Sequence, residues 1–208
     1  MTEKKLKICG YYTPDYIKYV KAFLNTYKGR GDVWFQPLDY ISRDKATGLK
    51  PRIFKNSISG EYDFYIFSDV DLLFRPDFCF TELCQENSIG VIIRDQFNYP
   101  QRSVNASRIT VPKNIIQEFT TEWLSVSNES EIDDVKIDDM APTHIVNQYY
   151  WDQVSLNHVY KKYKHHNISQ YEYLSQRMTE RVKILSPHAY DLERKNALFD
   201  KLKDQLSR

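Results

Sequence analysis

The sequence predicts a single α/β domain in which a β-sheet is flanked by helices. Three observations support this fold class. The length of 208 residues fits one domain and leaves no room for two full enzyme domains. Strand-like and helix-like segments alternate along the first third of the chain, which is typical of a sheet covered by helices. The hydrophobic share of 41%, with 14% aromatic residues, supplies enough core material to exclude intrinsic disorder.

The first third of the chain follows a β-α-β-α-β order. Its first helix begins at Thr13-Pro14-Asp15, which combines a capping residue, a proline suited to the first helical position and an acid that favours the helix dipole. Such alternation implies parallel strands with helices on both faces, and ligands then bind beyond the carboxyl ends of the strands. We expect strands over residues 6–12, 33–38 and 62–67, helices over 14–27 and 50–57, and a polar loop over 39–48.

The remainder of the chain is less regular but remains mixed α/β. The acidic stretch 129–139 favours a solvated loop over a metal-binding or partner-binding segment. The last predicted helix is charged and amphipathic. We expect strands over 89–93, 108–111 and 182–185, and helices over 114–126, 150–163 and 192–206.

Composition narrows the possible partners and the compartment. The net charge of +1 gives no general attraction to nucleic acid or to an anionic membrane. No apolar run approaches the length of about 18 residues that a membrane span needs, and no signal peptide is recognisable at the start. Cys9, Cys79 and Cys84 are odd in number and lack metal-site spacing, which favours reduced thiols. We expect a soluble, cytoplasmic protein without a membrane span.

The most informative motif is Asp69-Val70-Asp71, which follows an aromatic and aliphatic strand. Residues two apart in an extended segment point to the same side, so the two carboxylates can converge on a hard divalent cation. The alternative interpretation is a solvated strand end, because a D-x-D tripeptide is common by chance. The apolar surroundings favour a site, since carboxylates beside Phe67 and Leu72 would be costly to bury without a cation or hydrogen-bond partners.

At this motif the chain resembles the nucleotide-sugar glycosyltransferases of the GT-A fold, in which a similar strand runs into an Asp-x-Asp motif. Further segments resemble the family in the same order along most of the chain. They are Ile8 to Thr13 for the first strand and nucleotide loop, Lys50 to Lys55 for the basic helix, Ser103 to Ile109 for the F-N-x-G strand, Trp151-Asp152-Gln153 for the D-Q element and Lys183 to His188 for a late metal-binding segment. Ser107 stands where the family usually has Gly.

This resemblance implies a GT-A-like single domain over residues 1–208 with a Rossmann-like mixed sheet. It implies a nucleotide-binding part over about 1–100 and an acceptor-side part over about 101–208. The expected donor is a nucleotide-diphosphate sugar, most simply a UDP-sugar, used with Mn²⁺ or Mg²⁺, and the expected acceptor is a glycan or a glycoprotein. The small size, the lack of a recognisable signal anchor and the abundance of Lys, Tyr and Asn indicate a bacterial or viral enzyme, in the host cytoplasm if viral. The chain also resembles the short catalytic domain of an algal-virus glycosyltransferase that acts on capsid glycans.

The resemblance also implies roles for individual residues. The metal ligands would be Asp71 and His188, with Asp69 binding the ribose or the metal. The remaining nucleotide-binding residues would be Tyr11, Tyr12, Thr13, Lys50 and Arg52, with the tyrosines against the base and the two cations against the phosphates.

Asp152 is the candidate for activating the acceptor or for stabilising an oxocarbenium-like transition state, because glycosyl transfer needs a carboxylate near the reacting hydroxyl. Its alternative role is a helix N-cap. Asp95, just beyond the predicted strand 89–93, is a second catalytic candidate.

Two other functions compete with glycosyl transfer. A nucleotidyltransferase is also α/β and also uses a carboxylate pair on a metal, but it usually carries a Gly-rich basic loop after the first strand, which Gly10-Tyr11-Tyr12-Thr13 does not resemble. The second alternative is a non-catalytic carbohydrate- or protein-binding module.

Overall fold

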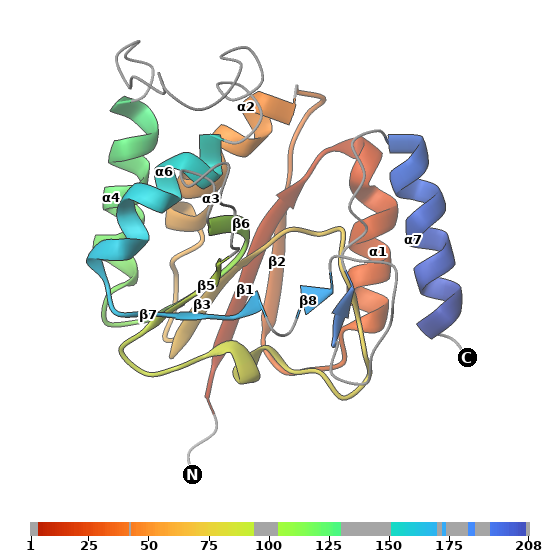
Figure 1. Cartoon of the computed structure of the whole chain (residues 1–208), viewed down its shortest axis with the longest axis horizontal. Coiled ribbons are helices and arrows are strands. Elements are labelled where there is room, and N and C mark those ends of the chain that lie inside the picture. Colours follow the sequence, from red (N-terminus) through yellow and green to blue (C-terminus); the bar gives the residue numbers. More distant parts are fainter. Residues whose placement is uncertain are drawn as a thin grey trace.

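The computed structural model describes residues 4–41, 43–93, 104–129, 151–169, 172–173, 183–185 and 192–206. A six-stranded mixed sheet forms its centre, in the order β2-β1-β3-β6-β5-β7 (Figure 1). β1 is parallel to β2 and β3, β6 runs antiparallel to both β3 and β5, and β7 is parallel to β5. The strands are β1 (Leu6–Tyr12), β2 (Asp32–Pro37), β3 (Phe64–Ser68), β5 (Ile89–Ile93), β6 (Val104–Pro112) and β7 (His165–Asn167).

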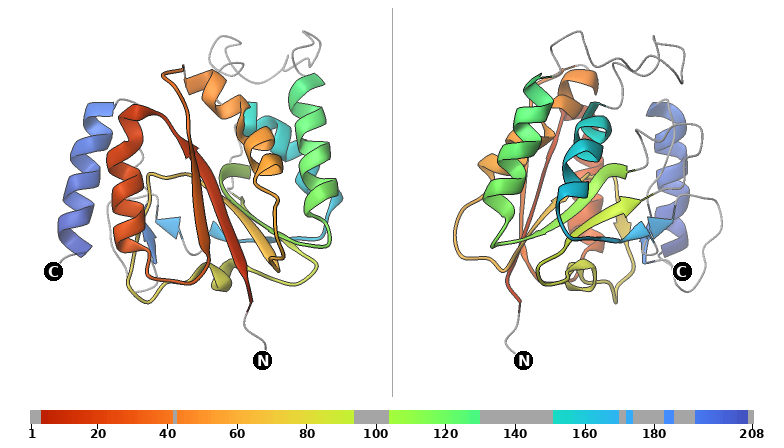
Figure 2. Two further views of the ribbon diagram at one scale, coloured as in Figure 1. Left: turned by 180° about the vertical axis from the view of Figure 1, so that it is seen from behind. Right: turned by 60° about the vertical axis from the view of Figure 1, so that its left-hand side comes forward.

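Helices cover both faces of this sheet (Figures 1 and 2). One face carries α1 (Ile17–Thr26) with α7 (Leu192–Leu206) beside it. The opposite face carries α2 (Arg43–Gly48), α3 (Lys50–Asn56), α4 (Ile116–Glu129) and α6 (Trp151–Val159). Short 3₁₀ helices occur at η1 (Pro14–Tyr16), η2 (Phe80–Leu83) and η4 (Tyr160–Lys162). Among the described residues, no helix has the length and apolar character needed to cross a membrane.

The alternating side chains of the central strands supply two separate cores. On β1 and β3, Cys9 and Phe67 pack into the core beneath α3, α4 and α6, whereas Ile8 and Ile66 pack into the core beneath α1. This is the period of two that an extended strand imposes. Because β3 is buried along its whole length, its sequence Phe64–Ser68 is a continuous apolar and aromatic run with one serine at the end.

A second, smaller sheet lies next to the Asp-x-Asp segment. β4 (Leu73–Phe74) pairs antiparallel with β9 (Ile184–Leu185), which pairs parallel with β8 (Glu172–Tyr173). The segment carrying Asp69 and Asp71 therefore joins the large sheet to the small one. Anchoring at both ends limits how far the two carboxylates can move.

The predicted α/β class with a mixed sheet flanked by helices is confirmed, as are the main strands and the last helix, Leu192–Leu206. The polar loop predicted over 39–48 is wrong in its second part, because Arg43–Gly48 forms α2, which contacts α6 and α3. Tertiary contacts here override a locally polar pattern. The helix predicted over 150–163 ends at Val159 and continues as 3₁₀ helix. Most of the acidic stretch 129–139 lies outside the described residues.

Candidate active site

The candidate site lies beyond the carboxyl ends of β1 and β3, where an α/β sheet of this kind binds ligands. Asp69 and Asp71 follow β3 directly. The backbone N–H of Asp69 donates to the carbonyl oxygen of Ser107 at 2.7 Å, which extends the β3–β6 pairing by one residue. Gly10 allows β1 to lie close to this point, because a Cβ there would stand 2.2 Å from the carbonyl oxygen of Ser68.

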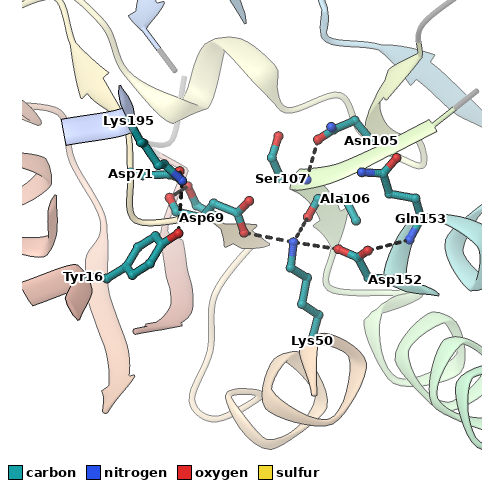
Figure 3. Close-up of polar contacts among 11 residues, drawn as sticks. Tyr16, Lys50, Asp69, Asp71, Asn105, Ala106, Ser107, Asp152, Gln153 and Lys195 are labelled. Carbon is teal, nitrogen blue, oxygen red and sulfur yellow. Dashed lines mark hydrogen bonds and ion pairs between the residues drawn. The ribbon is translucent and has the colours of Figure 1, made fainter. Parts of the chain in front are cut away.

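Lys50, the first residue of α3, lies at the centre of one group of contacts, which we call the Lys50 cluster (Figure 3). Its ammonium is 3.0 Å from Asp69 Oδ1 and 2.8 Å from Asp152 Oδ2, and it donates to the carbonyl oxygen of Ala106 at 3.2 Å. An ammonium has three N–H groups, so these three acceptors use all of them. The side chains of Lys50 and Asp152 are only 6% and 3% exposed, whereas Asp69 is 32% exposed.

Asp152 is thereby brought to the Asp-x-Asp motif from 83 positions further along the chain. It is the second residue of α6, and its Oδ1 accepts the backbone N–H of Gln153 at 2.9 Å. This local contact lies in the first turn of α6, where the helix dipole favours an acid, but it is not the N-cap contact of the alternative interpretation, and the contact with Lys50 is tertiary. A carboxylate has about four lone-pair positions, so these two contacts leave capacity for a further partner.

Asp71 forms a second group of contacts with α7, which we call the Lys195 cluster (Figure 3). The ammonium of Lys195 contacts Asp71 Oδ2, and the two side chains are 14% and 13% exposed. Lys195 also donates to the hydroxyl oxygen of Tyr16 at 3.2 Å and lies 4.8 Å from the centre of that ring. The two carboxylates of one short motif are thus paired with lysines from two different helices.

The electrostatic surroundings separate the two carboxylates. Burial raises the pKa of Asp69 to about 6, and the attraction of Lys50 offsets this only in part. Burial acts on Asp71 in the same direction, but the Lys195 ammonium outweighs it and lowers the pKa of Asp71. Burial alone would lower the pKa of Lys50, yet the charges of Asp152 and Asp69 raise it, so Lys50 stays protonated. Among the described residues, three carboxylates face two ammonium groups, which gives this part of the site an excess negative charge.

A bulge in β6 forms another part of the site. The β5–β6 register pairs Val91 with Ile109 but the next residue, Ile92, with Asn105, so Ala106 to Arg108 bulge out of the pairing. Asn105 Oδ1 accepts the N–H of Ser107 at 2.8 Å and fixes this conformation. The carbonyl groups of Ala106 and Ser107 can then accept from Lys50 and from Asp69.

The other predicted nucleotide-binding residues are only partly brought together. Tyr11 is close enough for the charges of Lys50 and Asp69 to influence its hydroxyl, although burial is the main reason that its pKa is raised. Tyr12 packs against the core between α1 and α7, and Thr13 precedes η1. Arg52 is exposed, and as the second residue after Lys50 it lies on another side of α3. Asp95 and His188 lie outside the described residues.

Lys195 is a site residue that the sequence analysis did not identify. Its partner stands 124 positions earlier, so no local pattern links the two. One signal was present in the last helix: Lys195 precedes Phe199 and Leu202 at helical spacings of four and seven, on the face that packs against the protein. A lysine on such a face needs a partner for its charge.

The carboxylates of the site could supply part of the coordination shell of a hard divalent cation. Within the described part of the chain, no group of three or more His, Cys, Asp or Glu side chains could hold a metal ion by itself. Asp69 and Asp71 supply carboxylate oxygens, and Mg²⁺ or a similar ion is commonly held by one or two carboxylates together with the phosphates of a substrate. The two carboxylates therefore suit a metal that arrives with a diphosphate.

No protein-family model and no curated protein matches this sequence. Among solved structures, the chain is similar to the crystal structure of a glycosyltransferase involved in the glycosylation of the major capsid of PBCV-1. The TM-score is 0.60 at 11% sequence identity, and the match covers 94% of this chain and 100% of the other. This similarity establishes the fold: the chain is an α/β protein with a glycosyltransferase-like, Rossmann-type arrangement. It supports the resemblance drawn from the sequence at the level of fold.

Proposed function

We propose that this chain is a metal-dependent glycosyltransferase of the GT-A type, which transfers a sugar from a nucleotide diphosphate, most simply UDP, to a glycan or protein-linked acceptor. The observation that carries the proposal is that Lys50 joins Asp152 to Asp69 of the Asp-x-Asp motif beyond the carboxyl ends of β1 and β3, with Asp71 two residues further along. A glycosyltransferase-like fold with its carboxylates at this end of the sheet supports sugar transfer over other uses of a D-x-D motif.

On the donor side, Asp71 and Asp69 would hold a divalent cation, with Asp69 also able to reach the ribose. Mn²⁺ or Mg²⁺ supplies positive charge to the diphosphate leaving group. Tyr11 stands beside this charged group and is available for the base or the sugar. Lys50, whose N–H groups are all used, fits a role in holding the carboxylates rather than in contacting a phosphate.

On the acceptor side, Asp152 is the carboxylate that would act on the reacting hydroxyl. The bond from the anomeric carbon to the diphosphate oxygen breaks, the bond from that carbon to the acceptor oxygen forms, and the hydroxyl proton leaves the acceptor. Asp152 would either accept this proton or stabilise the positive charge at the anomeric carbon. Lys50 and Gln153 hold the carboxylate in one orientation, which supports such a role.

The proposal is tested by incubating the protein with Mn²⁺ and a panel of nucleotide sugars and following free nucleoside diphosphate. We expect turnover of at least one sugar donor, its loss in excess chelator, and its loss in Asp71→Asn, since a neutral amide is a poor ligand for a hard ion. Asp77→Asn is the matched control, because Asp77 is an exposed carboxylate that pairs with Lys183. Full turnover in chelator would contradict metal dependence. Release of pyrophosphate from a nucleoside triphosphate would indicate a nucleotidyltransferase, and the absence of any turnover would favour a binding module.

A further inference from the structure

The Lys195 cluster occupies the carboxylate that the proposed reaction needs for its metal. The ammonium of Lys195 contacts Asp71 Oδ2, and both side chains are largely buried. An ammonium and a divalent cation cannot share one carboxylate oxygen at bonding distance, because like charges a few ångströms apart repel strongly. The metal must therefore share Asp71 with Lys195 or displace it.

Lys195 is held less firmly than the lysine of the neighbouring cluster. Lys50 has three acceptors, two of them carboxylates, which match its three N–H groups. Among the described residues, Lys195 is held by one carboxylate, by the hydroxyl oxygen of Tyr16 and by the faces of two tyrosine rings. Of the two lysines, Lys195 is the one that can leave its carboxylate at the smaller cost.

The docking of α7 does not depend on this lysine alone. Phe199 packs edge-on against Tyr19 with ring centres 4.6 Å apart, and the Tyr19 hydroxyl donates to Asn196 Oδ1 at 2.5 Å. Phe199 and Leu202 are buried in the core shared by α1 and α7. The helix can therefore stay on α1 while the long, unbranched Lys195 side chain changes its contact.

We infer that Lys195 is the internal counter-ion of Asp71 and that it competes with the divalent cation for this carboxylate. The inference rests on the proposed function, which supplies the metal. In the metal-free protein Lys195 neutralises Asp71, and metal binding at Asp71 releases its ammonium. Lys195 thus sets the metal affinity of the site, and the first turn of α7 responds to metal occupancy.

The test is Mn²⁺ binding to the full chain without nucleotide, measured from the electron paramagnetic resonance signal of free Mn²⁺. Lys195→Met keeps the apolar stem and removes the charge, so we expect Mn²⁺ to bind about tenfold more tightly, the size expected when one charge-assisted contact no longer competes. Lys195→Arg keeps the charge and should stay near wild type. Lys201→Met, which removes an exposed charge from the same helix, is the matched control and should also stay near wild type.

A second measurement does not rely on a variant. The backbone amides of residues 196–199 donate to the carbonyl groups of the first turn of α7, so their hydrogen exchange should become faster when Mn²⁺ is added to the wild-type protein and should be unchanged in Lys195→Met. Equal or weaker Mn²⁺ binding in Lys195→Met would overturn the inference, as would the absence of Mn²⁺ binding to both proteins. Nucleotide-sugar turnover is measured separately: tighter Mn²⁺ binding in Lys195→Met without any turnover would leave the inference standing and contradict the proposed enzyme.

Discussion

The two carboxylates of the Asp-x-Asp motif stand two residues apart, yet they belong to different clusters. In the Lys50 cluster, Asp69 shares a saturated and nearly buried ammonium with Asp152. In the Lys195 cluster, Asp71 pairs with a lysine from the last helix, whose other hydrogen-bond partner within the described part of the chain is the hydroxyl of Tyr16. The first arrangement is built to hold its members in place, and the second is built so that one member can be exchanged.

The difference follows from where the lysines come from. Lys50 lies on α3, which packs on β1 and α4 inside the larger core, so the stem of its side chain is buried by protein on its way to the carboxylates. Lys195 lies on α7, at the outer side of α1 (Figure 2). A short motif can therefore combine a fixed carboxylate with an exchangeable one when its two side chains reach different layers of the fold.

The largest expected effect concerns Asp152, which only the Lys50 cluster contains. Asp152→Asn should lower turnover by about 10² to 10⁴, the range of a positioned acid or base, while leaving the affinity for the nucleoside diphosphate unchanged. Titration of that nucleotide is the control for donor binding. If turnover per folded molecule stays at the wild-type value and only thermal stability falls, Asp152 stabilises its helix and has no catalytic role.

The next effect separates the two lysines by stability. Lys50→Met leaves Asp69 and Asp152 facing each other without a cation, so it should cost about 3 kcal/mol of unfolding free energy. Lys195→Met should cost less, about 2 kcal/mol, because it leaves one largely buried carboxylate without its cation instead of two.

Urea denaturation of both variants, measured in chelator, checks this order. Adding Asp152→Asn to Lys50→Met should recover part of the loss, because it removes one of the two unpaired charges. Equal losses for Lys50→Met and Lys195→Met would show that the two clusters do not differ in rigidity.

Much of the fold could be predicted from the sequence, because the signals are local. The apolar run at β3, the proline at the start of η1 and the periodic pattern of Leu192–Leu206 each express a local preference within a few residues. Thr13 makes no side-chain capping hydrogen bond, and α1 begins only at Ile17, after the short 3₁₀ helix. One exception is Arg43–Gly48, a mainly polar segment whose helix packs against α6, far along the chain. Local patterns carry no information about such contacts.

The residues of the two clusters were identified from the sequence only in part, and their pairings were not identified. Asp69, Asp71, Asp152 and Lys50 were each identified from motifs, but the ion pair of Lys50 with Asp152 depends on how α3 and α6 approach the bulge in β6. Lys195 was missed because an amphipathic helix on the surface commonly carries lysines in its polar part. Its alignment with Phe199 and Leu202 was the available sign.

A smaller effect concerns the pH dependence of the metal-free protein. The folded-state pKa of Asp69 is raised from 3.8 to about 6, so between these values the folded protein holds a proton that the unfolded chain has lost. This group therefore makes stability fall as the pH rises from about 4 to about 6. Asp71, with its pKa lowered, contributes in the opposite direction at lower pH: its stabilisation is lost as the pH falls through that lowered pKa.

Urea midpoints of wild type and Asp69→Asn, taken in chelator across this pH range, isolate the contribution of Asp69. The difference between the two proteins should change with pH in the stated direction, in favour of Asp69→Asn at the higher pH. A constant difference would mean that Asp69 is ionised in the folded protein over this whole pH range. Its pKa would then not be raised, and Asp69 and Asp71 would both be ionised carboxylates.

The smallest expected effect is that of Arg52→Ala. This variant tests whether Lys50 is the only one of these two α3 cations that influences the site. Successive residues of a helix are about 100° apart, so Arg52 points about 200° away from Lys50, and its side chain is exposed. An exposed charge on a helix usually changes the free energy of unfolding by no more than about 0.5 kcal/mol. Because Arg52 is exposed and points away from the Lys50 cluster, solvent and salt screen its charge, and Arg52→Ala should alter the affinity for the nucleoside diphosphate by less than about twofold. Isothermal titration of the diphosphate at low and at moderate salt checks this. A loss of tenfold or more would place a phosphate near Arg52, on a side of α3 that the Lys50 cluster does not reach, and would return Arg52 to the phosphate-binding role that the resemblance implies.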